Sequence, residues 1–152
     1  MPSRRGPNRC LELISQARVM TLATSADNYP WTAPVYYFYR DRAFYFFSSP
    51  EARHICDGKD RQCAASIFRT HDCVENLEGL QMSGLVLEQG AGPQAVAVAG
   101  AYARQFSISF AGSDILGFFT KAFHARLYKF VPDLVYHMDN RRGFGFREPI
   151  DL

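Results

Sequence analysis

Hydrophobic and polar residues alternate over several short stretches of this chain, which is the pattern of half-buried β-strands. The clearest stretches are residues 18–24, 31–39, 43–48, 62–69, 80–89, 122–130 and 134–138. Turn-forming residues separate the first three stretches at residues 25–30 and 40–42, which predicts an antiparallel meander. The pattern as a whole predicts six or seven strands.

Helical spacing of apolar residues is confined to a few segments. It is clear over residues 8–17, where Asn8 is the expected N-cap, and it recurs over residues 93–106. Residues 107–121 are apolar and aromatic without a clear period. We expect this segment to form either helical turns over the end of a barrel or an interface.

Many short strands and few helices indicate a mainly β protein. At 152 residues the chain is most simply a single domain. We expect an antiparallel split β-barrel, closed or nearly closed, because closure removes exposed strand edges; a two-sheet sandwich is the alternative. Residues 1–7 are expected to be a loose N-terminus and residues 140–152 a C-terminal tail.

Composition narrows the classes of function. Aromatic residues make up 14% of the chain, including 13 Phe, which is more than one small barrel buries easily. We therefore expect a homodimer, with residues 107–123 as part of its interface. A net charge of +2 gives no support to nucleic-acid binding. No apolar run approaches the roughly 18 residues that cross a bilayer, and the four cysteines lack paired spacing, so we expect a cytoplasmic protein with reduced thiols and no membrane partner.

One segment carries the residue types of a phosphate site. A short helix is expected at residues 50–56, because Ser49 can cap its free amides and Pro50 suits the first helical position. The hydroxyl pair Ser48 and Ser49 precedes this helix, and Arg53 follows one turn inside it. Helix amides and a guanidinium together favour a phosphate. The alternative is an ordinary capped helix whose Arg53 faces solvent.

The order of these elements and one motif resemble a known family. The motif reads Phe46-Phe-Ser-Ser-Pro-Glu-Ala-Arg-His54. It resembles the phosphate-binding motif of the pyridoxamine 5′-phosphate oxidase-like superfamily of FMN-binding split barrels, and the resemblance covers residues 18–88, with weaker support at 122–138. Ala52 and His54 stand where the family has a serine and a lysine. By this resemblance the residues around the FMN phosphate are Phe47, Ser48, Ser49, Arg53 and His54.

The resemblance also implies where the flavin ring lies. Residues 31–36 resemble the strand that runs beside the ring, through Pro34, Val35 and Tyr36. Gln81 and Ser83 share one face of a strand by alternation, so either one contacts the edge of the ring; alternatively, Gln81 is simply solvated. A second subunit completes the flavin site in this superfamily, and Phe118, Phe119 and residues 140–147 are candidates for that role.

Three functions follow as hypotheses. The first is an FMN-dependent oxidoreductase that acts on an unidentified small molecule as electron donor or acceptor. It needs no protein nucleophile or metal, which fits a sequence without a recognisable catalytic pair. The second is a non-enzymatic flavin- or haem-binding protein, with His54 or His124 as the iron ligand, and the third is a cofactor-free interaction domain. His71, His124 and His137 are isolated, and each is expected to be an ordinary surface or core histidine. The C-terminal substrate signature of the family oxidase is missing, so we expect little oxidation of pyridoxamine 5′-phosphate.

Overall fold

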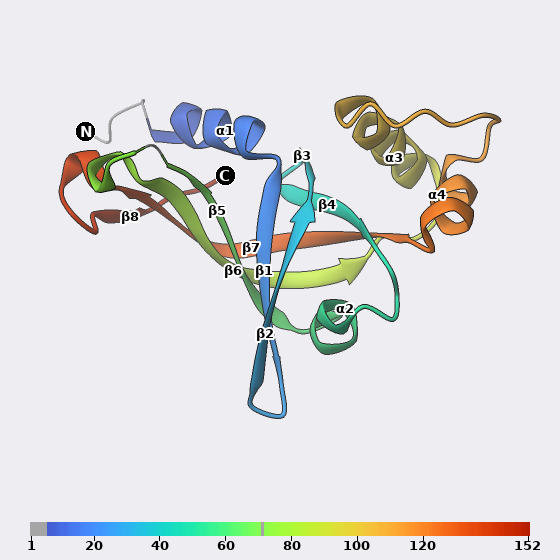
Figure 1. Ribbon diagram of the computed structural model, residues 1–152, viewed down its shortest axis with the longest axis horizontal. Helices are drawn as coiled ribbons and strands as arrows, with labels where there is room; N and C mark the ends of the chain where they lie inside the picture. Colours follow the sequence, from blue (N-terminus) through green and yellow to red (C-terminus); the bar gives the residue numbers. More distant parts are fainter. Residues whose placement is uncertain (1–5, 71) are drawn as a thin grey trace.

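A computed structural model describes residues 6–70 and 72–152, which form one curled antiparallel sheet with helices at its ends (Figure 1). The strands are β1 (Val19–Ala26), β2 (Tyr29–Tyr36), β3 (Phe38–Arg40), β4 (Ala43–Ser48), β5 (Gln62–Arg69), β6 (Glu78–Glu88), β7 (Arg126–Asp139) and β8 (Arg147–Pro149). The helices are α1 (Gly6–Ala17), α2 (Arg53–Gly58), α3 (Pro93–Gln105) and α4 (Ile115–Phe123), with 3₁₀ turns η1 (Val74–Asn76) and η2 (Asn140–Arg142).

The sheet is a split barrel, as expected from the sequence. Its strand order is β2-β1-β5-β6-β7-β4-β3, and β8 adds to β7. The two edge strands, β2 and β3, are consecutive in the chain, so the sheet curls round without closing through a ladder between them. The predicted β1–β2 and β3–β4 hairpins are confirmed. The predicted three-strand meander differs from the structure in its middle strand, which is divided into β2, paired with β1, and β3, paired with β4; β4 also pairs with β7.

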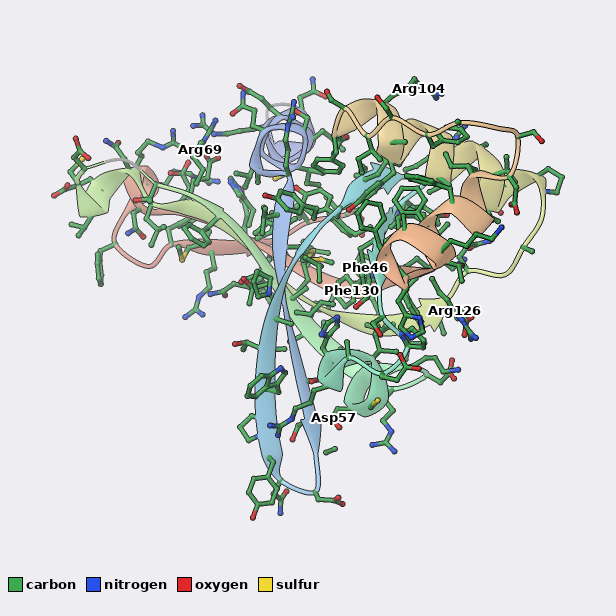
Figure 2. All side chains as sticks on the ribbon, turned by 45° about the vertical axis from the view of Figure 1, so that its right-hand side comes forward. Phe46, Asp57, Arg69, Arg104, Arg126 and Phe130 are labelled. Carbon is green, nitrogen blue, oxygen red and sulfur yellow. The ribbon has the colours of Figure 1, made fainter. Side chains whose placement is uncertain are left out.

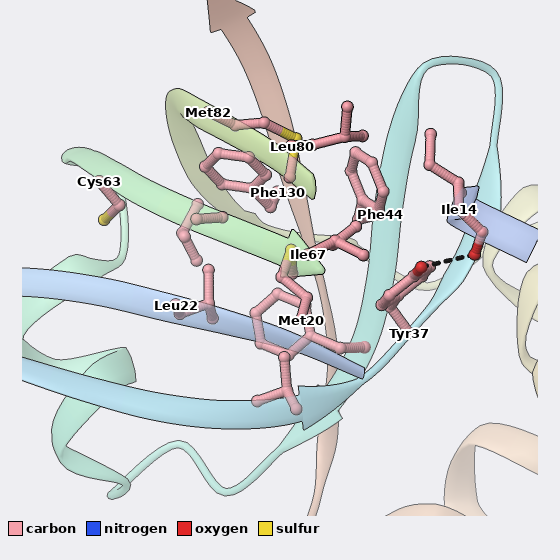
Figure 3. Close-up of a cluster of buried hydrophobic side chains, with 14 of the residues drawn as sticks. Ile14, Met20, Leu22, Tyr37, Phe44, Cys63, Ile67, Leu80, Met82 and Phe130 are labelled. Atoms are coloured by element: carbon pink, nitrogen blue, oxygen red, sulfur yellow. Dashed lines mark hydrogen bonds between the residues drawn. The ribbon is translucent and has the colours of Figure 1, made fainter. Parts of the chain in front are cut away.

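The predicted strand over residues 31–39 breaks at Tyr37. The side chain of Tyr37 is buried, and its hydroxyl donates a hydrogen bond of 2.5 Å to the carbonyl of Ile14 on α1 (Figure 3). Its backbone N–H bonds the carbonyl of Arg18 at 3.0 Å. These contacts hold the chain at the point where it leaves β2 for β3. The break separates β2, which pairs with β1 at one end of the sheet order, from β3, which pairs with β4 at the other end.

The core lies inside the curl of the sheet and under α1. Figure 3 shows Met20, Leu22, Phe44, Ile67 and Phe130 directed into it from the four strands β1, β4, β5 and β7. Strand alternation produces this arrangement, since every second residue of β1 and β5 is buried. The alternation that predicted half-buried strands at these positions is therefore confirmed.

A second cluster lies between the sheet and the helices α3 and α4. The ring of Phe47 stacks on Phe119 with centroids 3.7 Å apart, and Tyr102 meets Phe47 edge-on. Residues 107–121, which showed no clear period, thus contain most of α4, and its buried residues Ile115 and Phe119 pack within the chain. Some of the many aromatic side chains are therefore buried within the chain.

The two strands expected at residues 122–130 and 134–138 are one strand, β7. Residues 131–133, expected to separate two strands, form a bulge, where Gly84 of β6 faces Pro132. A Cβ built on Gly84 would lie 2.2 Å from the carbonyl oxygen of Val131. Glycine thus lets the bulged strand approach closely enough to continue the ladder.

Both ends of the chain differ from expectation. α1 begins at Gly6, so Asn8 lies inside the helix and is not its cap; residues 1–5 of the predicted loose terminus lie outside the described residues. The predicted tail at residues 140–152 contains η2 and the strand β8, which pairs with β7. Within the described residues, none of the helices has the length and apolar character needed to cross a membrane.

Gly84→Ala should destabilise the fold, because its methyl group would meet the backbone at the bulge. We expect a loss of about 1–3 kcal/mol, or a fall of roughly 3–10 °C in Tm for a chain of this size. Gly90→Ala is the matched control, because a Cβ there meets nothing within 4 Å. Thermal unfolding followed by circular dichroism measures both, and equal Tm values for the two variants would contradict the role given to Gly84.

Candidate functional site

The segment between β4 and α2 differs locally from its prediction. α2 begins at Arg53, and its N-cap residue, Ala52, has no side-chain cap. The hydroxyl of Ser49 is used within the preceding turn instead: it donates to the carboxylate of Glu51 at 2.8 Å and accepts the N–H of Glu51 at 3.3 Å. Pro50 lies in that turn, so the predicted Ser49 cap and Pro50 start are wrong. The local Ser49–Glu51 bonds compete successfully with capping.

Ser48 and His54 come together across this turn. The hydroxyl of Ser48 lies 2.8 Å from Nε2 of His54, and both residues are half-buried. Burial lowers the pKa of His54 below its usual value of 6.5, so the imidazole is mainly neutral near pH 7. The pair forms a polar group at the end of β4 with one hydroxyl and one titratable ring.

Arg53 connects α2 to β2. Its guanidinium lies 4.3 Å from the centre of the Trp31 ring, and its Nε is 3.2 Å from the carboxylate of Asp57. Figure 2 shows Asp57 on α2, beside the β1–β2 hairpin. The Arg53 side chain is 46% exposed, so this ion pair is solvated and weak. The guanidinium can therefore exchange Asp57 for another anion at little cost.

The β2 candidates divide between two faces of the sheet. Pro34 and Tyr36 are exposed on the outer face, whereas Val35 is buried in the core. Trp31 shares the inner side with Val35, because residues two and four apart lie on one face. The ring of Phe47 is covered by Phe119, so its side chain is not available to a ligand.

Gln81 and Ser83 lie on the outer face of β6, as alternation predicted. Gln81 is exposed, with Arg147 at 3.4 Å, and Ser83 donates to Asp133 at 2.7 Å. Strand pairing places Gln81, Ser66, Thr21 and Pro34 in one row across four strands. Three strand spacings of about 4.8 Å separate the ends of that row. The candidates thus form two groups, one beside α2 and one on the outer face.

Sequence reasoning missed a charged cluster around Glu78, which is fully buried at the start of β6. Its carboxylate accepts hydrogen bonds from Arg9 at 2.6 Å, Arg69 at 2.6 Å and His137 at 3.0 Å, and Arg141 lies 2.8 Å away. Burial alone would raise the pKa of Glu78, but these hydrogen bonds outweigh it and hold the pKa at about 2. No local motif marks this cluster, because its members come from α1, β5, β7 and η2.

The cluster does not suit a metal ion. Ligand atoms of Glu78, His137 and Asp139 all lie within 4.8 Å of one another, and they are the one such group among the described residues. However, three guanidinium groups already occupy the Glu78 carboxylate, and Arg141 also pairs with Asp139 at 2.7 Å. A cation entering there would displace the pairs that stabilise these buried carboxylates. The group is a structural clasp that ties α1 and η2 to the sheet.

The remaining histidines and thiols have ordinary structural surroundings. His137 is the buried partner of Glu78, as expected for a structural residue. His124 ends α4 and bonds Glu51 at 2.7 Å, with both side chains exposed. The four cysteines are free thiols, as expected. His71 lies outside the described residues.

Comparison with known proteins identifies the family of this arrangement. The family model described as "Pyridoxamine 5'-phosphate oxidase" matches residues 7–83, which include β2, the β4–α2 segment and Gln81. A search of curated proteins finds no match. The matched range is half of the chain and contains most of the residues that the resemblance selected.

Solved structures share the fold at low identity. Campylobacter jejuni ChuZ is 13% identical with a TM-score of 0.74; the match covers 95% of this chain, which spans 58% of that one. The FAD-binding protein of Mycobacterium smegmatis is 11% identical with a TM-score of 0.64, and the match covers 95% and 97% of the two chains. HutZ, the haem storage protein of Vibrio cholerae, is 12% identical with a TM-score of 0.67, and the match covers 84% and 89%.

Glu78→Gln should destabilise the protein at pH 7, because Arg9, Arg69 and Arg141 would lose their shared anion. We expect roughly 2–4 kcal/mol, below the value for a fully buried pair because the arginines reach solvent. The pKa of Glu78 is depressed in the folded state, so its stabilisation is present above its unfolded pKa, near 4.5, and is lost as pH falls toward about 2. Urea unfolding at pH 7 and at pH 3 measures both effects.

The matched control is Glu75→Gln, an exposed carboxylate on η1. The cost of Glu78→Gln should shrink between pH 7 and pH 3, whereas Glu75→Gln should have little effect at either pH. A cost of Glu78→Gln that is the same at both pH values would show that the charge of Glu78 does not stabilise the fold.

Proposed function

This chain belongs to the pyridoxamine 5′-phosphate oxidase family, and on that premise we propose that it binds FMN through the β4–α2 segment and acts as an FMN-dependent oxidoreductase on an unidentified small molecule. The supporting observation is the contact between Ser48 at the end of β4 and His54 in the first turn of α2, with the exposed Arg53 directly before His54 in the chain. Their donor set, a hydroxyl, an imidazole and a guanidinium, fits a phosphate monoester.

Each of these residues would have a distinct role. Arg53 would exchange its exposed partner Asp57 for the phosphate and hold two oxygens with its planar fork. Ser48 would donate its hydroxyl proton, and His54 would take a second position beside it. Ser49 is the weakest candidate of the motif, because its hydroxyl already serves Glu51.

The outer sheet face is the proposed place of chemistry. A bound flavin supplies the redox chemistry, so no protein nucleophile is needed. Pro34 and Tyr36 lie beside the β2 edge, and Gln81 and Ser83 lie farther across the same face. These residues would bind and orient the flavin and the small-molecule donor or acceptor. We assign no substrate, because membership of the family does not identify one and the C-terminal substrate signature of the family oxidase is missing.

We also propose a homodimer that buries the outer sheet face. That face carries exposed apolar side chains at Tyr36, Phe68, Leu85, Leu134 and Tyr136. Small residues lie between them, with Ala64 paired to Ala23 and Ser83. A flat face of this kind favours association. It is a better candidate than residues 107–123, whose Ile115 and Phe119 are buried within the chain.

A haem-binding protein is the second candidate, and one observation favours it. HutZ, whose fold is similar, is a haem storage protein. Nε2 of each candidate histidine already has a partner, Glu51 for His124 and Ser48 for His54. The two differ in access: His124 is exposed at the end of α4, beside the exposed ring of Phe123, whereas His54 is half-buried. His124 is therefore the residue that would ligate iron. The absorption spectrum separates the two proposals, because flavin bands support the first and a Soret band that is lost in His124→Ala supports the second.

The homodimer is tested by placing a charge on each candidate surface. Ala64→Glu adds a carboxylate to the outer sheet face, and Ala122→Glu adds one to the exposed side of α4. We expect light scattering at micromolar concentration to give twice the chain mass of 17.2 kDa for the wild type and for Ala122→Glu, and the single mass for Ala64→Glu. The reverse result would place the interface on α4, and a monomeric wild type would refute the dimer.

Arg53→Ala should weaken FMN binding about ten- to hundredfold, because a charge-assisted pair contributes about 1.5–3 kcal/mol. Arg53→Lys should recover part of the loss, since it keeps the charge without the fork. Trp31, the only tryptophan, lies against Arg53, so its fluorescence reports binding together with that of the flavin.

Arg104→Ala is the matched control, because Arg104 is an exposed arginine on α3, away from α2 (Figure 2). It should leave FMN affinity unchanged. Unchanged affinity in Arg53→Ala, with a wild-type circular dichroism spectrum, would show that Arg53 does not hold the phosphate.

A further inference from the structure

His54 is a titratable group at a position where the charge on the protein decides how well a phosphate is held. Its ring bonds Ser48 at 2.8 Å and is half-buried, and Arg53 is its neighbour in the chain. A lysine there would stay charged at every physiological pH, whereas a histidine gains and loses its charge within that range. The Ser48–His54 pair therefore differs from a fixed cation in how it responds to pH.

Few other charged groups lie where they could shift the pKa of His54. Strands β1 and β2, which pack against α2, contain no Asp, Glu, Lys, Arg or His. The nearby charges are internally paired: Arg53 with Asp57, Glu51 with His124, and Arg126 of β7 with Glu88. The other ionisable groups on β2, β4, α2 and the β7 residues that pair with β4 are Tyr29, Tyr36, Tyr45, Cys56, Tyr128 and Lys129. Lys59, which follows α2, pairs with Asp60 and Glu88.

These other groups leave the protonation of His54 to burial and to its ligand. Burial raises the pKa of Tyr45 and of Tyr128 above the ordinary tyrosine value of 10, so both side chains stay neutral between pH 5 and 8. Burial disfavours the imidazolium in the free protein. A dianionic phosphate beside the ring would favour it, so proton uptake by His54 and phosphate binding would reinforce each other.

We propose that His54 makes the binding of the flavin phosphate proton-linked, so that this chain holds phosphorylated flavin more tightly in mildly acidic than in mildly alkaline solution. This inference rests on the proposed function, because it deepens the role of the same phosphate site. In this proposal the contact of His54 with the phosphate depends on pH, whereas that of Arg53 does not.

The test compares wild type with His54→Gln and His54→Lys. Glutamine can still bond Ser48 but has no charge at any pH, and lysine keeps its charge throughout. FMN dissociation constants are measured by flavin fluorescence from pH 5.5 to 8. The phosphate of FMN itself titrates near pH 6, and the ratio of variant to wild-type constants at each pH cancels this effect.

We expect the ratio for His54→Gln to be within about threefold of one at pH 8 and to rise to about tenfold or more at pH 5.5, in line with a charge-assisted hydrogen bond. The His54→Lys variant should bind FMN tightly at every pH, because the charge of its lysine does not change between pH 5.5 and 8. Riboflavin, which lacks the phosphate, should bind all three proteins with the same pH profile.

Two different results would overturn two different claims. Parallel FMN profiles for wild type and His54→Gln would refute proton linkage through His54 while leaving the FMN site intact. The absence of FMN binding by all three folded proteins, His54→Lys included, at every pH would overturn the proposed function on which the inference rests.

Discussion

The pairing of β6 with β7 is the constraint on which the rest of the structure depends. These are the two longest strands, and each of β4, β5 and β8 is held by one of them. Their ladder continues past the bulge because Gly84 admits the backbone of Val131 and Pro132. At one end the ladder carries Glu78 opposite Asp139, and beyond its other end, at the start of β7, Arg126 pairs with Ser48 of β4. The same pairing therefore positions both the buried clasp and the candidate phosphate site.

Arginine–carboxylate pairing has opposite consequences at the two places. Glu78 is fully buried and shared by three arginines, so losing any one partner leaves charge in a poorly solvated site. Arg53 and Asp57 form an exposed pair on one helix, where water can replace either partner. The first arrangement is suited to holding α1 and the C-terminal segment in place. The second is suited to exchange with a ligand, because little free energy is lost when the pair opens.

The sequence predicted what depends on neighbours in the chain. Alternation located β4 and β5 with their observed bounds, and it put Gln81 and Ser83 on one face. It failed where distant contacts decide the outcome. The break at Tyr37 depends on a bond to α1, and the continuity of β7 depends on Gly84 in another strand.

The start of α2 was predicted incorrectly because two local interactions of similar strength compete for the Ser49 hydroxyl. The Ser49 hydroxyl can cap a helix or bond within its own turn, and Glu51 decides for the turn by supplying both a donor and an acceptor. The Glu78 cluster forms no local motif, because its partners are scattered from Arg9 to Arg141. A polar residue that begins an apolar strand, as Glu78 does, is the one sequence cue that could have raised the question.

The edge of β2 determines how a single ligand could use both groups of candidate residues. Arg53 contacts the inner side of this strand through Trp31, whereas Pro34 and Tyr36 lie on its outer face. A ligand that contacts both groups must therefore pass along the free edge. The bond from Tyr37 N–H to Arg18 shows which alternate residues point their N–H groups at β1. By that alternation the nitrogen of Pro34 faces the free edge and has no proton to donate. The edge thus offers a ligand carbonyl oxygens and the flanking N–H groups, and the missing donor at Pro34 discourages another strand from pairing there.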